Sequence, residues 1–206
     1  ELVELMDELD GDARLFGAVN TVCIRDGRAY GYNTDGAGFL RALNDEGIDP
    51  AGKRVLVLGA GGAAKAAALA LAQAGCRVTV CARTPEKAAA LAARCGGVTV
   101  SWEDLPRAAA EHGLLLNATP LGMEGSPEFE SLDFVQALPT KAVVYDLVYH
   151  PTDTALLRAA GSRELTAVGG LALLVQQAAL AFAHFTGIVP DAALCRNILQ
   201  ELEAAQ

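Results

Sequence analysis

The chain has 206 residues, 52% of them hydrophobic and 20% charged, which is typical of a globular protein with a sizeable core. Its formal net charge of −9 argues against nucleic acid as a partner, because phosphate binding needs a basic surface. Five cysteines without a C-x-x-C pair and three scattered histidines argue against a disulfide framework and a metal site, and favour a reducing, cytoplasmic environment.

The N-terminal part is predicted to contain a helix end, a hairpin and a second helix. Residues 1–9 carry three leucines and a methionine at helical spacing, which predicts the end of an amphipathic helix. Residues 17–24 are strand-like, and an Asp-Gly turn leads from them into a second strand over 28–32. A helix is expected next, with Thr34 or Asp35 as its N-cap.

Beyond residue 49 the pattern changes to alternating strands and helices. Turn residues at 49–52 mark an expected domain boundary region. Strands and helices then follow in the order strand 54–58, helix 63–74, strand 77–81, helix 85–94, and strands 98–100, 114–117 and 142–147. Repeated β-α-β units of this length predict a parallel sheet with helices on both faces.

The C-terminal part is predicted to be helical. The most apolar stretch, 165–185, contains polar residues and two glycines, so we read it as a buried loop and helix and expect neither a membrane span nor a signal peptide. The long helix is expected over 171–186, a further helix is expected to open at Pro190, and 201–206 are expected to fray.

A glycine-rich loop, GAGGAA, directly follows the strand at 54–58 and opens the next helix. Gly59 permits a tight turn, Gly61 lets the backbone approach a pyrophosphate, and the small Ala64 lets helix and strand pack closely. The helix N-terminus offers unpaired N–H groups and partial positive charge to a phosphate. In this strand–loop–helix context the pattern favours a dinucleotide site over a plain turn.

The end of the second strand of this unit indicates which dinucleotide binds. NAD-binding proteins usually have an acidic residue there for the ribose 2′-hydroxyl, but this sequence has none until Glu86. Arg83 offers a planar guanidinium to a 2′-phosphate, Thr84 adds a hydroxyl, and Lys87 adds a third contact one turn on. The alternative, that Arg83 is an ordinary surface arginine, is weaker. The sequence therefore predicts NADP.

Three polar patches outside this unit are candidates for a substrate site: Asn20-Thr21, residues 33–36 (NTDG) and Gln176-Gln177. Polar side chains within apolar elements need partners, because burying one unpaired costs about 1–3 kcal/mol. They could satisfy one another, or they could converge on a polyhydroxylated ligand.

Seven motifs run in order through essentially the whole chain. They are GAVNTV (17–22), GYNTDG (31–36), GAGGAA (59–64), ART (82–84), NATPLGM (117–123), YDLVY (145–149) and GGLALLVQQ (169–177). Together they resemble the shikimate dehydrogenase family. The resemblance implies the reversible, NADP-dependent reduction of 3-dehydroshikimate to shikimate, a step of chorismate and aromatic amino-acid biosynthesis.

The resemblance also implies the residues of the site. Substrate contacts would come from Asn20, Thr34, Asp35, Tyr149 and Gln177. Asp35 would also be catalytic, as half of a proton-transferring Lys–Asp pair. The phosphates of NADP would be held by Gly59, Ala60, Gly61, Gly62, Ala63, Ala82, Arg83, Thr84 and Lys87. Near the nicotinamide or its ribose would lie Thr119, Leu147 and Gly170.

The sequence departs from the family pattern at two points. The family's catalytic lysine and a Ser-x-Ser pair for the substrate carboxylate lie upstream of the matching motifs, and none of the four lysines here occupies a matching position. Ala82 replaces the asparagine that is usual in the family's Asn-Arg-Thr motif. We therefore expect an N-terminally truncated chain that binds NADP but turns over poorly, because removing half of an acid–base pair typically costs ~10²–10⁴-fold in rate.

The expected fold class is α/β: a Rossmann-type doubly wound parallel sheet, plus the remaining part of an α/β substrate-binding domain closed by C-terminal helices. We expect residues 1–34 to form the rear of the substrate domain, 35–169 the NADP-binding domain, and 170–206 helices that pack back on the substrate domain. The expected partner is a small-molecule substrate, with no nucleic acid and no membrane, for a monomer or homodimer.

Three other functions agree less well with the sequence. A quinate/shikimate dehydrogenase that uses NAD is disfavoured by Arg83 without a nearby acid. A non-catalytic NADP-binding module would not need the polar motifs around Asp35. A folate-linked or tRNA-linked dehydrogenase with a similar dinucleotide half is not expected to carry NTDG at this distance before the glycine loop.

Overall fold

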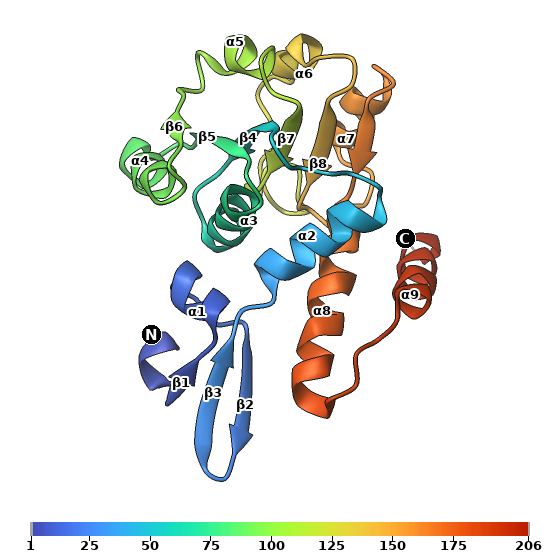
Figure 1. Ribbon diagram of the computed structural model, residues 1–206. Coiled ribbons are helices and arrows are strands. Elements are labelled where there is room, and N and C mark those ends of the chain that lie inside the picture. The colour runs from blue at the N-terminus through green and yellow to red at the C-terminus, as the bar shows by residue number, and fades with distance from the viewer. Residues whose placement is uncertain (1, 206) are drawn as a thin grey trace.

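A computed structural model describes residues 2–205 and shows two sheets with helices packed between and around them (Figure 1). The smaller sheet has the strand order β1-β3-β2, and the larger has the order β6-β5-β4-β7-β8-β9. Every neighbouring pair of strands in the larger sheet is parallel. The predicted α/β class with a doubly wound parallel sheet is confirmed.

The larger sheet reverses its winding direction between β4 and β7. Its strands are β4 (Arg54–Leu58), β5 (Arg77–Cys81), β6 (Val98–Thr99), β7 (Leu114–Asn117), β8 (Val143–Asp146) and β9 (Thr166–Val168). The chain runs outward from β4 to β6 and then restarts beside β4 with β7, so the carboxyl ends of β4 and β7 meet at the switch point. Ligands of doubly wound sheets bind at such a crevice.

Helices cover both faces of the larger sheet, which is why its strands are buried apolar runs. The two faces are separate cores: Val55 and Val57 point into one, and Leu56 and Leu58 into the other. The first core is covered by α2 (Asp35–Asp45), α3 (Gly62–Gln73), α4 (Pro85–Arg94) and the start of α8 (Gly170–Thr186). The second is covered by α5 (Leu105–Ala109), α6 (Asp133–Ala137) and α7 (Ala155–Gly161).

The N-terminal unit is a small sheet beside a short helix. It contains the 3-10 turn η1 (Val3–Leu5), β1 (Glu8–Leu9), α1 (Gly11–Phe16), β2 (Thr21–Arg25) and β3 (Arg28–Tyr32). The predicted hairpin is confirmed, since β2 and β3 pair antiparallel across the turn at Asp26 and Gly27. Figure 1 shows α2 between this hairpin and the larger sheet, and α8 running from the sheet to lie beside β2, where Arg25 donates to the His184 carbonyl at 3.0 Å.

The prediction of a helix over residues 1–9 is wrong for the described part of that segment. Backbone pairing with β3 wins over helical spacing, because the Asp7 N–H donates to the Ala29 carbonyl at 2.9 Å and the Asp7 carboxylate accepts the Ala29 N–H at 2.6 Å. Leu2 and Leu5, expected on a buried face, are 52% and 71% exposed. Glu1 lies outside the described residues.

Several boundaries also differ from the prediction. The strand expected from residue 17 begins at Thr21, because Gly17 has a left-handed backbone (φ 66°) and ends α1. The last helix, α9 (Ala192–Ala204), opens after Asp191, whose carboxylate caps it by accepting the Leu194 N–H at 2.8 Å, rather than at Pro190. This helix continues through residues expected to fray, of which Gln206 lies outside the description. Within residues 2–205, no helix combines the length and hydropathy needed to cross a membrane.

Candidate active site

Polar side chains from two N-terminal elements form a hydrogen-bonded cluster at the start of α2. The Asn20 amide, just before β2, donates to the Asp35 carboxylate at 2.7 Å and to the Thr34 hydroxyl at 3.1 Å. The Asn20 side-chain oxygen accepts the Thr34 N–H at 3.1 Å. Asn33 fixes the turn into the helix by accepting the Asp35 N–H at 3.0 Å. These bonds hold Asn20, Thr34 and Asp35 on one side of the first turn of α2.

Gln177, far away in the sequence, reaches the same cluster from α8. Its Oε1 lies 3.4 Å from the Thr34 hydroxyl. The approach depends on Gly38 in α2, since a Cβ there would lie 2.8–2.9 Å from the backbone N and Cα and the Cβ of Gln177. The helices can cross this closely only because position 38 has no side chain. The structure thus brings together four of the five residues predicted for the substrate.

Tyr149, the fifth of these residues, is not part of the cluster. It lies beyond the end of β8, its side chain is 48% exposed, and within residues 2–205 it has no hydrogen bond to the other four. The structure places it at the carboxyl edge of the larger sheet instead. In the sequence Tyr149 lies two residues after Leu147, in the segment that follows β8.

The Asp35 carboxylate is partly buried, and its electrostatics follow from that burial. Desolvation raises the pKa of Asp35 above its usual value, and the hydrogen bond from Asn20 opposes this by stabilising the charged form. Within residues 2–205 no lysine forms an ion pair with it. A carboxylate with a raised pKa beside hydroxyl and amide groups is suited to take part in proton transfer.

The glycine loop lies where the order of the larger sheet reverses. The Gly59 N–H donates to the Cys81 carbonyl at 2.7 Å, and φ is +113° at Gly59, a conformation that favours glycine. A Cβ at position 59 would lie 2.7 Å from the Ala118 carbonyl and 3.3 Å from the Thr119 Cγ2. The loop after β4 therefore packs directly on the loop after β7, next to Thr119.

The N-terminus of α3 has the properties of a phosphate site. Gly61 occupies the N-cap position without a capping side chain, and the first turn of the helix carries no acidic residue. A Cβ at Gly61 or Gly62 would meet no other atom within 4 Å, so the backbone is open on this side. Unpaired N–H groups and the helix dipole point into that space. Ala60 and Ala63 flank the two glycines, and the whole segment fits a dinucleotide diphosphate.

The end of β5 presents cationic and hydroxyl groups to the same edge of the sheet. Ala82 is partly buried, whereas Arg83, Thr84 and Lys87 are exposed. Thr84 occupies the N-cap position of α4 but its hydroxyl makes no capping hydrogen bond. Within residues 2–205 Arg83 has no ion pair, so its guanidinium is available to a 2′-phosphate.

Of the three residues predicted near the nicotinamide, Thr119 follows β7, Leu147 follows β8 and Gly170 is the first residue of α8. The Leu147 N–H donates to the Asn117 carbonyl at 2.9 Å, which joins the two loops. A Cβ at Gly170 would lie 2.3 Å from the Leu147 carbonyl oxygen, so α8 begins in direct contact with the loop after β8. Thr119 donates from its hydroxyl to the Asn117 side chain at 2.7 Å. All three therefore belong to one connected group.

Sequence reasoning missed the buried side chains that connect this group. Asn117 and Asp146 are both 0% exposed and hydrogen-bond to each other, the Asn117 amide donating to Asp146 Oδ1 at 2.8 Å. Each lies within a motif that was recognised, NATPLGM and YDLVY. A signal was present: a polar residue at the end of each of two apolar strands that the sequence predicts to be neighbours.

The strand order, the glycine loop at the switch point and the flanking helices define a Rossmann-type α/β protein. The family model "Shikimate / quinate 5-dehydrogenase" matches residues 43–123. An NADP(+) shikimate dehydrogenase from Acidiphilium cryptum is 47% identical over 198 residues, which are 95% of this chain and 71% of the relative. The chain therefore belongs to the shikimate dehydrogenase family.

Two solved structures have a fold similar to that of this chain. Shikimate 5-dehydrogenase from Thermus thermophilus, in complex with NADP(H) and shikimate, superposes with a TM-score of 0.83 at 41% identity, covering 96% of this chain and 73% of that one. The ligand-free 5-ketofructose reductase of a Gluconobacter species superposes with a TM-score of 0.83 at 34% identity, covering 100% of this chain and 75% of that one.

Proposed function

We propose that this chain carries the NADP site and most of the substrate site of a dehydrogenase that interconverts shikimate and 3-dehydroshikimate. The observation that carries the proposal is the convergence of Asn20, Thr34, Asp35 and Gln177 from three separate elements. Amide, hydroxyl and carboxylate groups on one face suit a ligand with several hydroxyls. The family membership and the glycine loop indicate that NADP is the redox partner.

The cofactor, NADP, supplies the hydride that is transferred. In this chain the open backbone from Gly59 to Ala63 would hold its diphosphate at the N-terminus of α3. Arg83 and Thr84, with Lys87 one turn on, would hold the 2′-phosphate. Ala82 adds only a methyl group beside them.

The substrate end would orient hydroxyl groups and handle one proton. Asn20, Thr34 and Gln177 each have a donor or acceptor that could exchange an internal hydrogen bond for one to the ligand. Asp35 would hold or move a proton at the hydroxyl that is oxidised, helped by the desolvation that raises its pKa. We also propose Tyr149 as a contact reached from the edge of the larger sheet.

We expect this chain to bind NADP but to turn over its substrate slowly. The resemblance to the family pairs Asp35 with a lysine, and within residues 2–205 none of the four lysines forms an ion pair with Asp35. A missing partner of an acid–base pair costs ~10²–10⁴-fold in rate. We further infer that the protein acts on small molecules in the cytoplasm, as a monomer or homodimer, with residues 35–169 as its cofactor domain.

Calorimetric titration with NADP⁺ and NAD⁺ tests the cofactor, and titration with shikimate and quinate tests the substrate. We expect NADP⁺ to bind and NAD⁺ to bind at least ~10-fold more weakly, as the loss of charge-assisted bonds to a phosphate predicts. Absence of NADP⁺ binding would refute the cofactor assignment. Turnover of shikimate comparable to that of the Acidiphilium cryptum relative would refute the reasoning about the lysine.

One alternative substrate, 5-ketofructose, should be compared directly with 3-dehydroshikimate. One structural neighbour is a 5-ketofructose reductase, and 5-ketofructose is also a carbonyl compound with several hydroxyls. A steady-state assay with NADPH should therefore offer 3-dehydroshikimate and 5-ketofructose in parallel. Preference for 5-ketofructose would keep the cofactor assignment and overturn the substrate assignment.

A further inference from the structure

A carboxylate without a positive partner lies at the end of β8. Asp146 is 0% exposed and forms no ion pair within residues 2–205. It accepts three hydrogen bonds instead, from the Asn117 amide at 2.8 Å, the Val148 N–H at 3.1 Å and the Thr154 hydroxyl at 2.7 Å. The three donors come from three different segments of the chain.

Asn117 carries this contact into the loop after β7. Its amide nitrogen also donates to the Leu121 carbonyl at 3.3 Å, and its side-chain oxygen accepts the Thr119 N–H at 3.1 Å and the Thr119 hydroxyl at 2.7 Å. With Asp146 these bonds use both donors and both lone pairs of the Asn117 side chain. Exchanging its oxygen and nitrogen would place an oxygen against the carboxylate, so only one orientation is possible.

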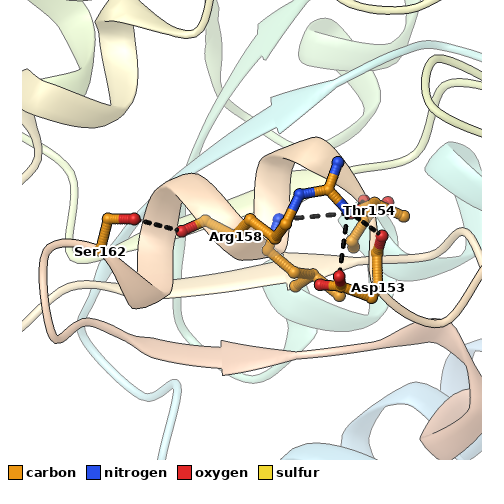
Figure 2. A network of polar contacts seen from close by, with 6 residues as sticks. Asp153, Thr154, Arg158 and Ser162 are labelled. Atoms are coloured by element: carbon orange, nitrogen blue, oxygen red, sulfur yellow. Dashed lines mark hydrogen bonds and ion pairs between the residues drawn. The ribbon is translucent and has the colours of Figure 1, made fainter.

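Thr154 carries the contact to α7. Its hydroxyl donates to Asp146 and also accepts the Leu157 N–H at 3.2 Å, which caps the helix. Figure 2 shows Thr154 at the start of α7, beside the ion pair of Asp153 with Arg158, whose atoms are 3.0 Å apart. The outer face of α7 is therefore held by exposed contacts, and its inner end is held by the buried carboxylate.

We infer that Asp146 is a positioning residue, which holds the loops after β7 and β8 in a fixed relation and so shapes the nicotinamide end of the cofactor site. The inference rests on the proposed NADP site. Two residues of the proposed nicotinamide end are joined directly to this network. Thr119 hydrogen-bonds to Asn117, and Leu147 stands in the chain between Asp146 and Val148, which hydrogen-bond to each other. Within residues 2–205 no side-chain hydrogen bond of the network reaches Arg83, and the glycine loop meets the network only through the packing of Gly59 on Ala118 and Thr119.

The charge of Asp146 makes this arrangement cooperative. Burial raises the pKa of the carboxyl, and the three donated hydrogen bonds oppose that shift. Withdrawing any one donor leaves the buried charge of Asp146 less compensated. The network is therefore most stable when the two loops and α7 are all in their native positions. Apolar side chains of equal volume would fill the space without specifying the direction of the two loops.

Comparison of two ligands tests the inference on the whole chain. NADP⁺ would reach both ends of the proposed site, whereas adenosine 2′,5′-bisphosphate has a 2′-phosphate for Arg83 and a 5′-phosphate for the glycine loop but lacks the nicotinamide end. We expect Asp146→Asn, which keeps the shape but removes the charge and the acceptor for Thr154, to weaken NADP⁺ binding about fivefold or more. Binding of adenosine 2′,5′-bisphosphate should change less than about twofold.

Thr79→Val is the matched control. Thr79 is a buried residue of the same sheet, and its hydroxyl lies 2.8 Å from Nε2 of the buried His112, away from both loops. Its loss disturbs a buried polar pair of similar kind, and both ligands should bind within about twofold of wild type.

A pair of substitutions at Thr154 keeps the test decisive if Asp146→Asn fails to fold. Thr154→Val should weaken NADP⁺ alone, about threefold or more, and Thr154→Ser, which retains the hydroxyl, should restore it. Equal losses of both ligands, or no loss of either, would overturn the inference. If the wild-type chain binds neither ligand, the proposed NADP site itself fails.

Discussion

The crossing of α2 and α8 at Gly38 offers a quantitative test of how the polar cluster is assembled. A Cβ at position 38 would lie 2.8 Å from the backbone nitrogen of Gln177 and 2.9 Å from its Cα, and real Cβ atoms essentially never come closer than 3.0 Å. Ordinary contact begins at 3.4 Å, so Gly38→Ala requires α2 and α8 to separate by at least 0.2 Å (3.0 − 2.8), and by 0.6 Å (3.4 − 2.8) to reach ordinary contact. The movement separates Gln177 from Thr34.

Two opposing effects determine the stability of this variant. Alanine favours a helix over glycine by about 1 kcal/mol. Overpacking against a backbone that cannot rotate away costs about 1–3 kcal/mol. The upper part of that range applies, because the clash involves main-chain atoms, and we expect a net loss of about 1–2 kcal/mol in the free energy of unfolding. For a chain of this size this lowers Tm by about 2–8 °C.

Urea denaturation followed by circular dichroism measures the effect, with Gly161→Ala as control. Gly161 is the last residue of α7, and a Cβ there would meet no atom within 4 Å. The control should therefore be neutral or more stable by up to about 1 kcal/mol. Calorimetry should also show weaker shikimate binding for Gly38→Ala, with NADP⁺ binding less affected. If Gly38→Ala is as stable as the control, the close crossing does not determine where Gln177 lies.

Three further substitutions probe the two ends of the site. Arg83→Gln should weaken NADP⁺ binding by about tenfold or more and leave NAD⁺ binding unchanged in calorimetry, because the lost bonds go to the 2′-phosphate; equal losses would contradict this. Gly61→Ala should leave the urea midpoint nearly unchanged, since φ is −80° there and a Cβ meets no atom within 4 Å, yet it should weaken NADP⁺ binding about tenfold by entering the phosphate space. Asp35→Asn should be more stable than wild type at pH 7, because the folded chain holds the Asp35 proton more tightly than the unfolded chain does; this advantage should shrink as the pH falls through the raised pKa toward 3.8, and a difference independent of pH would count against the burial argument.

The parts of the fold that the sequence predicts are those with a strong local pattern. β4 and β7 are runs of apolar residues between turn signals, and both faces of the sheet bury them. β9 was missed because it has three residues, two of them exposed, at the edge of the sheet. α5 and α6 have five residues each, which is too few for a helical period to show.

The candidate site divides in the same way. The glycine loop and Arg83 are predictable because their chemistry depends on short spacings next to a strand. The placement of Gln177 beside Thr34 depends on where two helices cross, and no local pattern contains that information. Asp146 illustrates the same limit: its motif was recognised, but its partners come from segments that meet only in the folded sheet.

The residues of α8 between Gly170 and Gln177 connect the two ends of the site. Gly170 lets the helix begin against the Leu147 carbonyl, and Gly38 lets Gln177 approach α2 two turns later. Seven residues of helix span about 10 Å along its axis, so a rigid element fixes how the proposed nicotinamide end is placed relative to the polar cluster. Hydride transfer needs its reacting atoms within about 3–3.5 Å. Because each end of this segment is held by a contact that only glycine permits, α8 fixes the spacing of the two ends, and the loop after β8 takes part through its contact with Gly170.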